Sequence, residues 1–364
     1  MLLSTHHNIS IKGLAVAVPS GRISVDSFYP SFGEDIVQKF SEMAGVKQIT
    51  RSIDQQTASD LGYIAAKKLI IEKNIDTNEI GVLVFVSQKP DYRSPATAFV
   101  LQHRLGLGKE VICLDINLAC SGFVYGLQTT LSLLKNSSKK KALLITADTS
   151  NKTLSPEDRT MIMLFGDSGS AVLLEKEDQG NAVFQFGLRS NGYKFKSIIT
   201  PAGAFRNRDL PNKVEEWADG IKRSDYNTHM KGMDVFGFSI TDVPNLIIDF
   251  LEATKTETSH YDVVALHQAN IYILKQISRK VKIPFEKIPV SIDRYGNNSS
   301  NSIPLLLADH FEGKSQVLKI LISGFGAGLS WACGSIAMDT KDILPIIITD
   351  DIYTQGDFKS SEHD

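Results

Sequence analysis

Two hydrophobic spacings alternate along the chain. Short runs rich in Val, Ile and Leu have the character of buried strands, and the longer stretches between them repeat apolar residues at helical spacing. Strands are expected at 81–87, 111–116, 142–147, 171–175, 262–266, 288–292 and 317–323, and helices at 95–105 and 270–281. Because strands that alternate with helices stack into layers, the pattern predicts an α/β fold.

The order of these elements occurs twice. In each half, a strand, a helix, a second strand and a turn that opens another helix follow one another, and the two turns hold Cys120 and Asn297. The offset of roughly 180 residues is far longer than one unit of a repeat array, so it favours two similar domains packed together. We predict an N-terminal half at 1–177, a C-terminal half at 178–345 and a polar tail at 346–364.

Two segments depart from this periodicity. Residues 202–228 are rich in Arg, Asn, Asp and Gly, and we expect them to form an excursion over the surface. The tail keeps one apolar run, LPIIIT, and is expected to fray from Gln355.

The composition limits the function classes. With 364 residues, 42% of them hydrophobic and 22% charged, the chain can bury a large core and is expected to be globular. A net charge of -2 and no Lys/Arg cluster larger than 139–141 argue against a nucleic-acid partner. Because the sequence shows neither a leader-like N-terminus nor an apolar run of bilayer length, we expect no membrane insertion and a cytoplasmic location.

The cysteines point to thiol chemistry rather than to a metal. Cys113, Cys120 and Cys333 are too few and too scattered for a disulfide framework or a zinc cluster. Cys120 follows a predicted strand and stands at the start of an apolar helix, where unpaired N–H groups and the helix dipole favour the thiolate. It is therefore a candidate nucleophile, and the alternative is a small buried residue beside Ala, Ser and Gly.

Two further side chains are placed to share a crevice with this cysteine. His267 ends the strand at 262–266, and the carboxyl ends of strands are where α/β proteins bind ligands. Asn297 lies in a turn that leads into an apolar helix. The alternatives are a histidine that bonds its neighbours and an asparagine that caps a helix. If the halves are duplicated, Cys120 and Asn297 occupy equivalent positions at two facing helix starts.

Two glycine-rich runs differ in their expected use. The run at 324–328, GFGAG, lacks the Lys-Ser/Thr of a phosphate loop and the following βα unit of a dinucleotide site. We expect it to allow close backbone approach to a reacting group, for instance by supplying an N–H to an oxyanion. The run at 164–170, LFGDSGS, is expected to serve packing.

Together these segments resemble the β-ketoacyl-acyl-carrier-protein synthase III family of condensing enzymes. The resemblance rests on ACSGFVYGL around Cys120, HQAN from His267, GNNSSNSIPLLL from Gly296, DRTMIMLFGDSGSAVLL from Asp158 and GFGAGLSW from Gly324. These motifs keep the family's order from about Ile11 to Ile336, nearly the whole chain. The resemblance implies a duplicated thiolase fold, which is a five-layer α-β-α-β-α sandwich with mixed sheets, and a homodimer.

The resemblance also assigns roles to particular residues. Cys120 resembles the acylated nucleophile, and His267 with Asn297 resembles the pair that hydrogen-bonds the malonyl thioester carbonyl. The backbone N–H groups of Cys120 and Ala327 would hold the oxyanion. The positions that match substrate-binding residues are Arg159, Gly232, Phe236 and Asn270.

The reaction implied is a decarboxylating Claisen condensation in fatty-acid initiation. An acyl group on Cys120 would join a malonyl-acyl-carrier-protein thioester and give a 3-oxoacyl thioester. Acyl-coenzyme A and malonyl-acyl carrier protein are then substrates, acyl carrier protein is a partner, and neither a bound cofactor nor a metal is expected.

Several positions depart from the family pattern. The family carries a Trp and an Arg that sandwich the adenine of coenzyme A, whereas EDIVQKFSEMAGV offers Lys39 or Phe40 and Met43. Met233 stands where an asparagine is expected before DVF, and Ala327 stands where a middle glycine is usual.

The residues that would dock acyl carrier protein are also atypical. Tyr272 replaces a basic residue after HQAN, and Gly237 replaces another after DVF. These departures keep open an alternative within the fold, a synthase III-like acyltransferase or condensing enzyme of specialised metabolism that uses a different acceptor or donor.

Other classes fit less well. A thiolase has a second cysteine just before its glycine-rich loop, whereas Cys333 follows the loop here, and the elongating synthases carry two histidines where this chain has His267 and Asn297. A papain-like protease also orders its residues Cys, His, Asn. That family is usually exported and places an aromatic residue just after a cysteine motif near the mature N-terminus, and this sequence shows neither feature. A non-catalytic binding protein on this scaffold is disfavoured because all three polar site residues are retained.

Overall fold

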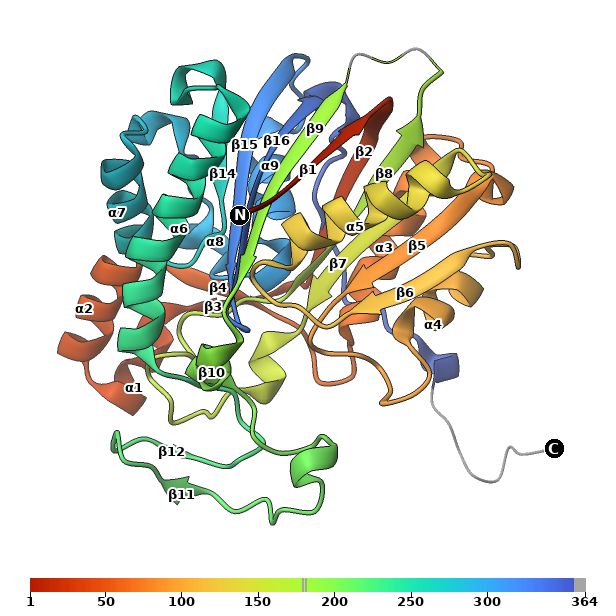
Figure 1. Cartoon of the computed structure of the whole chain (residues 1–364). Coiled ribbons are helices and arrows are strands. Elements are labelled where there is room, and N and C mark those ends of the chain that lie inside the picture. The colour runs from red at the N-terminus through yellow and green to blue at the C-terminus, as the bar shows by residue number, and fades with distance from the viewer. Residues whose placement is uncertain (179, 181, 357–364) are drawn as a thin grey trace.

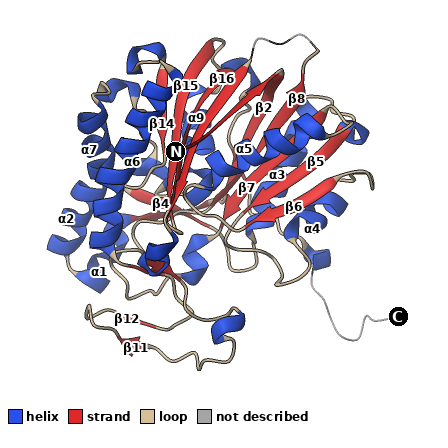
Figure 2. Ribbon diagram, in the orientation of Figure 1, coloured by secondary structure: helices blue, strands red, loops and turns tan. Residues whose placement is uncertain are grey.

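Two mixed sheets form the middle of the molecule (Figures 1 and 2). The computed structural model describes residues 1–178, 180 and 182–356. From edge to edge, the first sheet runs through β17 (Ile347–Ile348), β2 (Ile9–Val18), β8 (Ser168–Lys176), β7 (Lys141–Asp148), β5 (Ile80–Val86) and β6 (Ile112–Ile116). The second runs through β1 (Leu2–His7), β9 (Val183–Ser190), β16 (Ser330–Asp339), β15 (Val317–Gly326) and β14 (Val263–Leu266).

Helices cover both sheets and fill the space between them. The outer face of the first sheet packs against α3 (Ala58–Glu72) and α4 (Thr97–Arg104). Between the sheets lie α5 (Gly122–Asn136) and α9 (Ser302–Phe311), and the outer face of the second sheet packs against α6 (Gly232–Thr254) and α7 (Ile271–Val281). In the described part of the chain this arrangement has five layers, so the predicted α-β-α-β-α sandwich is confirmed.

Burial on both faces explains why β5 reads as an unbroken apolar run. Val82 and Val84 point into the core between the sheets, whereas Leu83 and Phe85 pack under the outer helices. All of these side chains are buried. Such a strand shows no polar alternation, because neither of its faces meets water.

One predicted strand is wrong. Residues 288–291 belong to neither sheet, and Ile292 begins the short helix α8 (Ile292–Tyr295). Pro289 removes a backbone donor from the run. Side chains take the neighbouring backbone groups instead, since the Ser291 N–H donates to Gln268 Oε1 (3.1 Å) and Val290 O lies 2.9 Å from His310 Nε2. The other predicted strands, and the helices at 95–105 and 270–281, are confirmed to within a few residues.

The two halves exchange strands near the ends of the chain. β1 pairs antiparallel with β9 in the second sheet, while β17 pairs parallel with β2 in the first. β17 uses the apolar run of the predicted tail, whose residues 357–364 lie outside the described part. The division of the chain at 177 and 345 stays a prediction.

The segment 202–228 projects from the body of the molecule, as predicted (Figure 1). It holds the hairpin of β11 (Glu215–Glu216) and β12 (Lys222–Arg223), and most of its residues between 204 and 220 are exposed. It lies between the partners of a second small pair, β10 (Ile198–Ile199) and β13 (His229–Met230). Arg223 is an exception, because its side chain is fully buried.

Four further elements share a smaller core with α8. They are α1 (Tyr29–Phe32), α2 (Glu34–Ala44) and the antiparallel pair of β3 (Gly21–Ser24) and β4 (Gln48–Arg51). Judged by length and hydropathy, none of the helices in the described residues could span a bilayer.

Candidate active site

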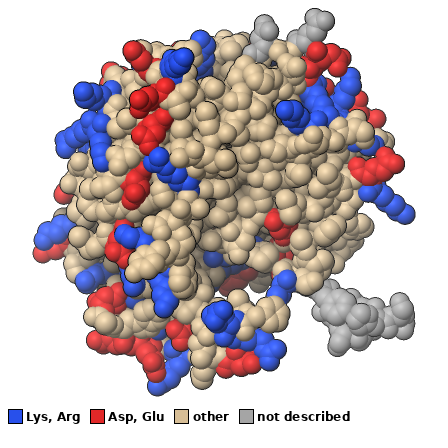
Figure 3. Space-filling view, in the orientation of Figure 1, with Lys and Arg blue, Asp and Glu red and all other residues tan. Residues whose placement is uncertain are grey.

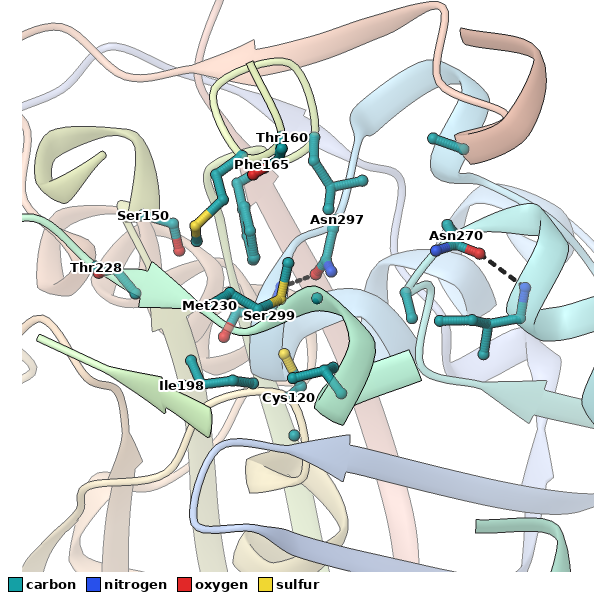
Figure 4. Close-up of a pocket in the computed structure, with 18 of the residues that line it drawn as sticks. Cys120, Ser150, Thr160, Phe165, Ile198, Thr228, Met230, Asn270, Asn297 and Ser299 are labelled. Atoms are coloured by element: carbon teal, nitrogen blue, oxygen red, sulfur yellow. Dashed lines mark hydrogen bonds between the residues drawn. The ribbon is translucent and has the colours of Figure 1, made fainter. Parts of the chain in front are cut away.

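Cys120, His267 and Asn297 line a single cavity of about 870 Å³. They reach it from different elements, since Cys120 precedes α5, His267 follows β14 and Asn297 follows α8. The other predicted site residues line the same cavity, namely Ala327, Arg159, Gly232, Phe236 and Asn270. Figure 4 shows the sulfur of Cys120 near Ser299 and on the same side of the cavity as the carboxamide of Asn297.

The turn that carries Cys120 is packed against the end of β15. A Cβ atom on Gly326 would lie 2.7 Å from the Cβ of Cys120 and 3.3 Å from its sulfur. One on Gly324 would lie 2.9 Å from the Cys120 carbonyl oxygen. The close backbone approach predicted for the glycine-rich run is therefore confirmed, because a side chain at either position would displace the cysteine.

The thiol of Cys120 is not activated in the resting protein. Burial raises its pKa to about 12, and the nearby carboxylate of Asp148 acts in the same direction. The Ser299 hydroxyl and the cysteine's own N–H lower the pKa, but by less. Burial therefore acts against the thiolate that a helix start favours.

His267 is held as a neutral imidazole. Burial lowers its pKa to about 3, against a smaller raising contribution from the backbone of Ser299. Its backbone N–H donates to Ser323 O (2.8 Å), and the edge of Phe325 meets its ring with the centroids 5.3 Å apart. Ring atom Nδ1 lies 3.1 Å from Ser302 Oγ, so the second ring nitrogen, Nε2, is left for a different partner.

Ser302 can serve either of two partners. Its hydroxyl oxygen lies 3.1 Å from His267 Nδ1 and 3.0 Å from Ser299 O. When the hydroxyl donates to Ser299 O, it can accept from Nδ1–H, and when it donates to Nδ1, the histidine carries its hydrogen on Nε2. Both tautomers of the neutral ring therefore have a partner.

The backbone of Asn297 is held by hydrogen bonds to the glycine-rich run at 164–170, which is the run expected to serve packing. Its N–H donates to Leu164 O (2.8 Å), and its carbonyl accepts from Gly166 N–H (3.0 Å). A Cβ on Gly166 would overlap the Tyr295 carbonyl, so only glycine fits there. The packing role is confirmed, and it serves the site because it fixes the backbone of Asn297.

The side chain of Asn297 is oriented by a local hydrogen bond. Its Oδ1 accepts from the Ser299 N–H at 3.0 Å (dashed line in Figure 4). This bond is a local one to the backbone two residues on, and it is not the helix cap of the alternative interpretation, because the residue before the turn at 299–301 is Asn298. Among the described residues no acceptor takes the amide nitrogen, so it is left to donate into the cavity.

The two backbone amides that the resemblance assigns to an oxyanion have no backbone acceptor within the part of the chain that the structure describes. In the described residues, neither the N–H of Cys120 nor that of Ala327 donates to a backbone carbonyl. Ser330 Oγ donates to Ala327 O (2.8 Å) and lies 2.7 Å from Ser121 Oγ. This pair of serines ties the two turns together, and sequence reasoning missed it.

The mouth of the cavity combines aromatic and basic side chains. Lys39 and Met43 come from α2, and Arg159 comes from the turn at 158–162. Phe236 of α6 stacks on Tyr272 of α7, with the ring centroids 5.8 Å apart. Both rings line the cavity, so the tyrosine that replaces a basic residue extends the apolar wall.

Asn270 lines the cavity but has a structural task. Its Oδ1 accepts from the Ile273 N–H at 2.7 Å and so caps the N-terminus of α7 (Figure 4). Its amide nitrogen remains the group that could meet a substrate.

Sequence reasoning also missed Asp148 and Lys89. Asp148 is fully buried and accepts from Ser87 Oγ (3.2 Å), Gln88 N–H (3.1 Å) and Ser300 Oγ (3.2 Å). Burial raises its pKa. Both residues follow or end strands of the first sheet at their carboxyl ends, which is the signal that could have found them.

Comparisons with known proteins agree with this geometry. The family model described as 3-oxoacyl-[acyl-carrier-protein (ACP)] synthase III matches residues 114–192, and the model of its C-terminal part matches 251–338. A β-ketoacyl-[acyl-carrier-protein] synthase III of Fusobacterium nucleatum is 31% identical over 331 residues, which cover 89% of this chain and 97% of that protein.

Solved structures of the same kind superpose over most of the chain. A 3-oxoacyl-(acyl-carrier protein) synthase from Burkholderia xenovorans matches with a TM-score of 0.90 and 34% identity, covering 96% of this chain and 99% of that chain. A 3-oxoacyl-(acyl carrier protein) synthase III from Pseudomonas aeruginosa matches with a TM-score of 0.77 and 28% identity, covering 94% and 100%. The chain therefore belongs to the 3-oxoacyl-[acyl-carrier-protein] synthase III family and is a condensing acyltransferase of the thiolase fold.

Proposed function

We propose that the chain catalyses a decarboxylating Claisen condensation that starts a fatty acyl chain. An acyl group passes from acyl-coenzyme A to Cys120 and then joins the enolate left when malonyl-acyl-carrier protein loses carbon dioxide. The product is a 3-oxoacyl thioester. The observation that supports this most is the convergence of Cys120, His267 and Asn297 on one cavity.

In the first half-reaction the thiol of Cys120 must lose its proton, because burial keeps it protonated at neutral pH. When Nδ1–H of the neutral His267 donates to Ser302, the lone pair on Nε2 can take that proton. The sulfur bonds to the acyl carbonyl carbon, the bond from that carbon to coenzyme A breaks, and the proton leaves with the coenzyme A sulfur. The amides of Cys120 and Ala327 stabilise the tetrahedral oxyanion.

In the second half-reaction the histidine becomes a donor. With Ser302 donating to Nδ1, the hydrogen lies on Nε2, and this group and the Asn297 amide hydrogen-bond the malonyl thioester carbonyl. Charge develops on that oxygen as carbon dioxide leaves, so both donors bind the enolate more tightly than the ground state. The enolate carbon attacks the acyl carbon, and the sulfur of Cys120 is released.

The test is covalent labelling by an acyl thioester. Intact-protein mass spectrometry should show one acyl group on the wild-type chain and none on Cys120→Ala, because the carbon–sulfur bond forms at that atom. Cys113→Ala is the matched control and should label like the wild type, since Cys113 lies on β6 outside the cavity lining. Equal labelling of Cys120→Ala and wild type would exclude the assignment.

The mouth of the cavity bears on which thioesters enter. Lys39 and Arg159 supply positive charge for the phosphates of coenzyme A or of a carrier-protein arm. Met43 and Met233 stand at positions where the family pattern has residues that bind coenzyme A or substrate, and both are largely exposed. Their lack of charge and of hydrogen-bonding groups favours the alternative of a condensing enzyme or acyltransferase with a different donor or acceptor. A panel of acyl-coenzyme A and acyl-carrier thioesters, scored by the mass added to Cys120, distinguishes the proposed condensation from this alternative.

With these substrates, we propose that the reaction takes place in the cytoplasm.

We further propose that two copies pair through the face that carries β6. This strand is an edge of the first sheet, and its side chains Ile112 and Leu114 are 46% and 39% exposed. Figure 3 shows that charged side chains lie mainly around the rim of this face, while its centre is uncharged. An exposed apolar edge strand is a template for pairing with another chain.

A further inference from the structure

Within the described residues, the charged side chains that line the cavity are all basic. Its lining includes Lys39, Arg159 and Lys89, and within the described residues no Asp or Glu lines it. Lys39 and Arg159 are exposed at the mouth, whereas Lys89 is largely buried. Lys89 follows β5 and lines the cavity together with Gln88 and Ser150.

The backbone that carries Lys89 is fixed, but its ammonium group is not engaged. The Lys89 N–H donates to Ser87 Oγ (2.9 Å), and the Gln88 N–H donates to Asp148 (3.1 Å). By contrast, no described residue forms a hydrogen bond or an ion pair with Lys89 Nζ.

The nearest carboxylates are occupied by other donors. Asp148 accepts from Ser87, Ser300 and the Gln88 amide, and Asp167 accepts from Ser52 and Asn151. Burial lowers the pKa of the Lys89 amine, and the more distant charges of these two carboxylates offset that only in part. An anion that entered the cavity beside this amine would give it a direct partner in addition to these more distant charges.

Part of the cavity wall suits an aliphatic chain. Figure 4 shows Ser150, Thr228 and Ile198 on the opposite side of Cys120 from Asn270, and Met230 and Phe165 line the same cavity. Leu154 and Met163 complete this apolar wall. Methylene groups would therefore lie against apolar side chains, while Gln88, Ser150 and Lys89 would meet a polar end group.

We propose that Lys89 binds a carboxylate at the far end of the acyl group, so that the preferred acyl donor is a monothioester of a dicarboxylic acid. This inference rests on the proposed function. The thiol of Cys120 attacks the thioester carbonyl, the bond to the coenzyme A sulfur breaks, and the thiol proton leaves with coenzyme A. The distal carboxylate takes no part in the bond changes and serves only to bind.

The test compares donors of equal length with and without the second carboxylate. The full chain is mixed with adipyl- or hexanoyl-coenzyme A, and with glutaryl- or valeryl-coenzyme A, and the rate of labelling at Cys120 is followed by mass spectrometry. We expect the carboxylated donor to react about tenfold faster in each pair, as one charge-assisted contact would give. Lys89→Met should reduce that ratio about tenfold, and Lys89→Arg should retain it because the charge remains.

Lys39→Met is the matched control, because it removes a lysine from the mouth and should change both members of each pair alike. A wild-type ratio near one, or a ratio that Lys89→Met leaves unchanged, overturns the inference. Labelling by hexanoyl-coenzyme A without any preference for adipyl-coenzyme A overturns this inference alone. Absence of labelling with every thioester overturns the proposed function instead.

Discussion

At the scale of single residues, the cavity holds the reacting groups in their neutral forms. The pKa of the Cys120 thiol is raised to about 12 and that of His267 is lowered to about 3, and burial is the largest cause of both shifts. A neutral pair suits the proposed reaction, in which an anionic malonyl group enters and an enolate is then stabilised, because an imidazolium would hold the carboxylate that has to leave.

The raised pKa of Cys120 predicts slow alkylation at neutral pH. Since the thiolate is the nucleophile, the rate with iodoacetamide should rise about tenfold per pH unit from about 7 to 10, whereas an ordinary thiol levels off near its pKa of about 8.5. Mass spectrometry of the peptide that contains Cys120 gives the rate. A plateau below about pH 9 would mean that another group removes the proton in the unliganded protein.

Asn297→Ala should separate the two half-reactions. The Asn297 amide is proposed to donate only to the enolate, so acylation of Cys120 should change little while malonyl decarboxylation slows by about two orders of magnitude, as for the loss of one oxyanion donor. Release of carbon dioxide and the mass added to Cys120 measure the two steps. Equal losses in both steps would contradict separate roles.

At the scale of elements, buried contacts tie the projecting segment 202–228 to the cavity wall. Arg223 of β12 is paired with Asp158 (2.7 Å) and with Asp219 (2.8 Å), and its guanidinium lies over the ring of Trp217, 5.2 Å from the centroid. Asp158 also accepts from the Thr160 N–H (3.0 Å). The hairpin therefore braces the turn that presents Arg159 and Thr160 to the cavity.

Arg223→Met should destabilise the protein by about 3 kcal/mol, because it leaves the buried carboxylate of Asp158 without its partner. Denaturant unfolding measures the change. Arg208→Met is the control, since the pair of Arg208 with Asp209 in the same segment is exposed and should contribute little. If the two variants unfold alike, Arg223 does not brace the hairpin.

The sequence predicted elements best where one local pattern decides the structure. Strands β5 and β7 could be predicted because both of their faces are apolar. The run at 288–292 is equally apolar, but the prediction of a strand there is wrong. Pro289 removes one backbone donor, and the side chains of Gln268 and His310 contact the neighbouring backbone groups. At the site, the motifs identified Cys120, whereas Lys89 stands out in the sequence only as a residue just past the end of a strand. Its significance depends on which distant carboxylates are already engaged, and only the folded arrangement shows that.

At the scale of the whole molecule, the proposed pairing through β6 predicts a dimer that a single charge can split. Ile112→Asp places a carboxylate on the exposed edge and should convert a dimer to a monomer in light scattering. Ile71→Asp, on the 63% exposed Ile71 of α3, adds the same charge away from that edge and should leave the mass unchanged. A wild-type monomer, or a dimer that survives Ile112→Asp, would exclude pairing through this strand.

The exchange of β1 and β17 between the sheets has a consequence for biosynthesis. β2 gains its outer neighbour only when Ile347 and Ile348 have left the ribosome, and β1 must wait for β9 to be translated. One edge of β2 therefore stays unpaired until residues 347–348 are available, although the other strands of its sheet need nothing beyond residue 176. The pairing of β17 with β2 thus joins the last strand of the described residues to the second, and it can form only after every other strand has been translated.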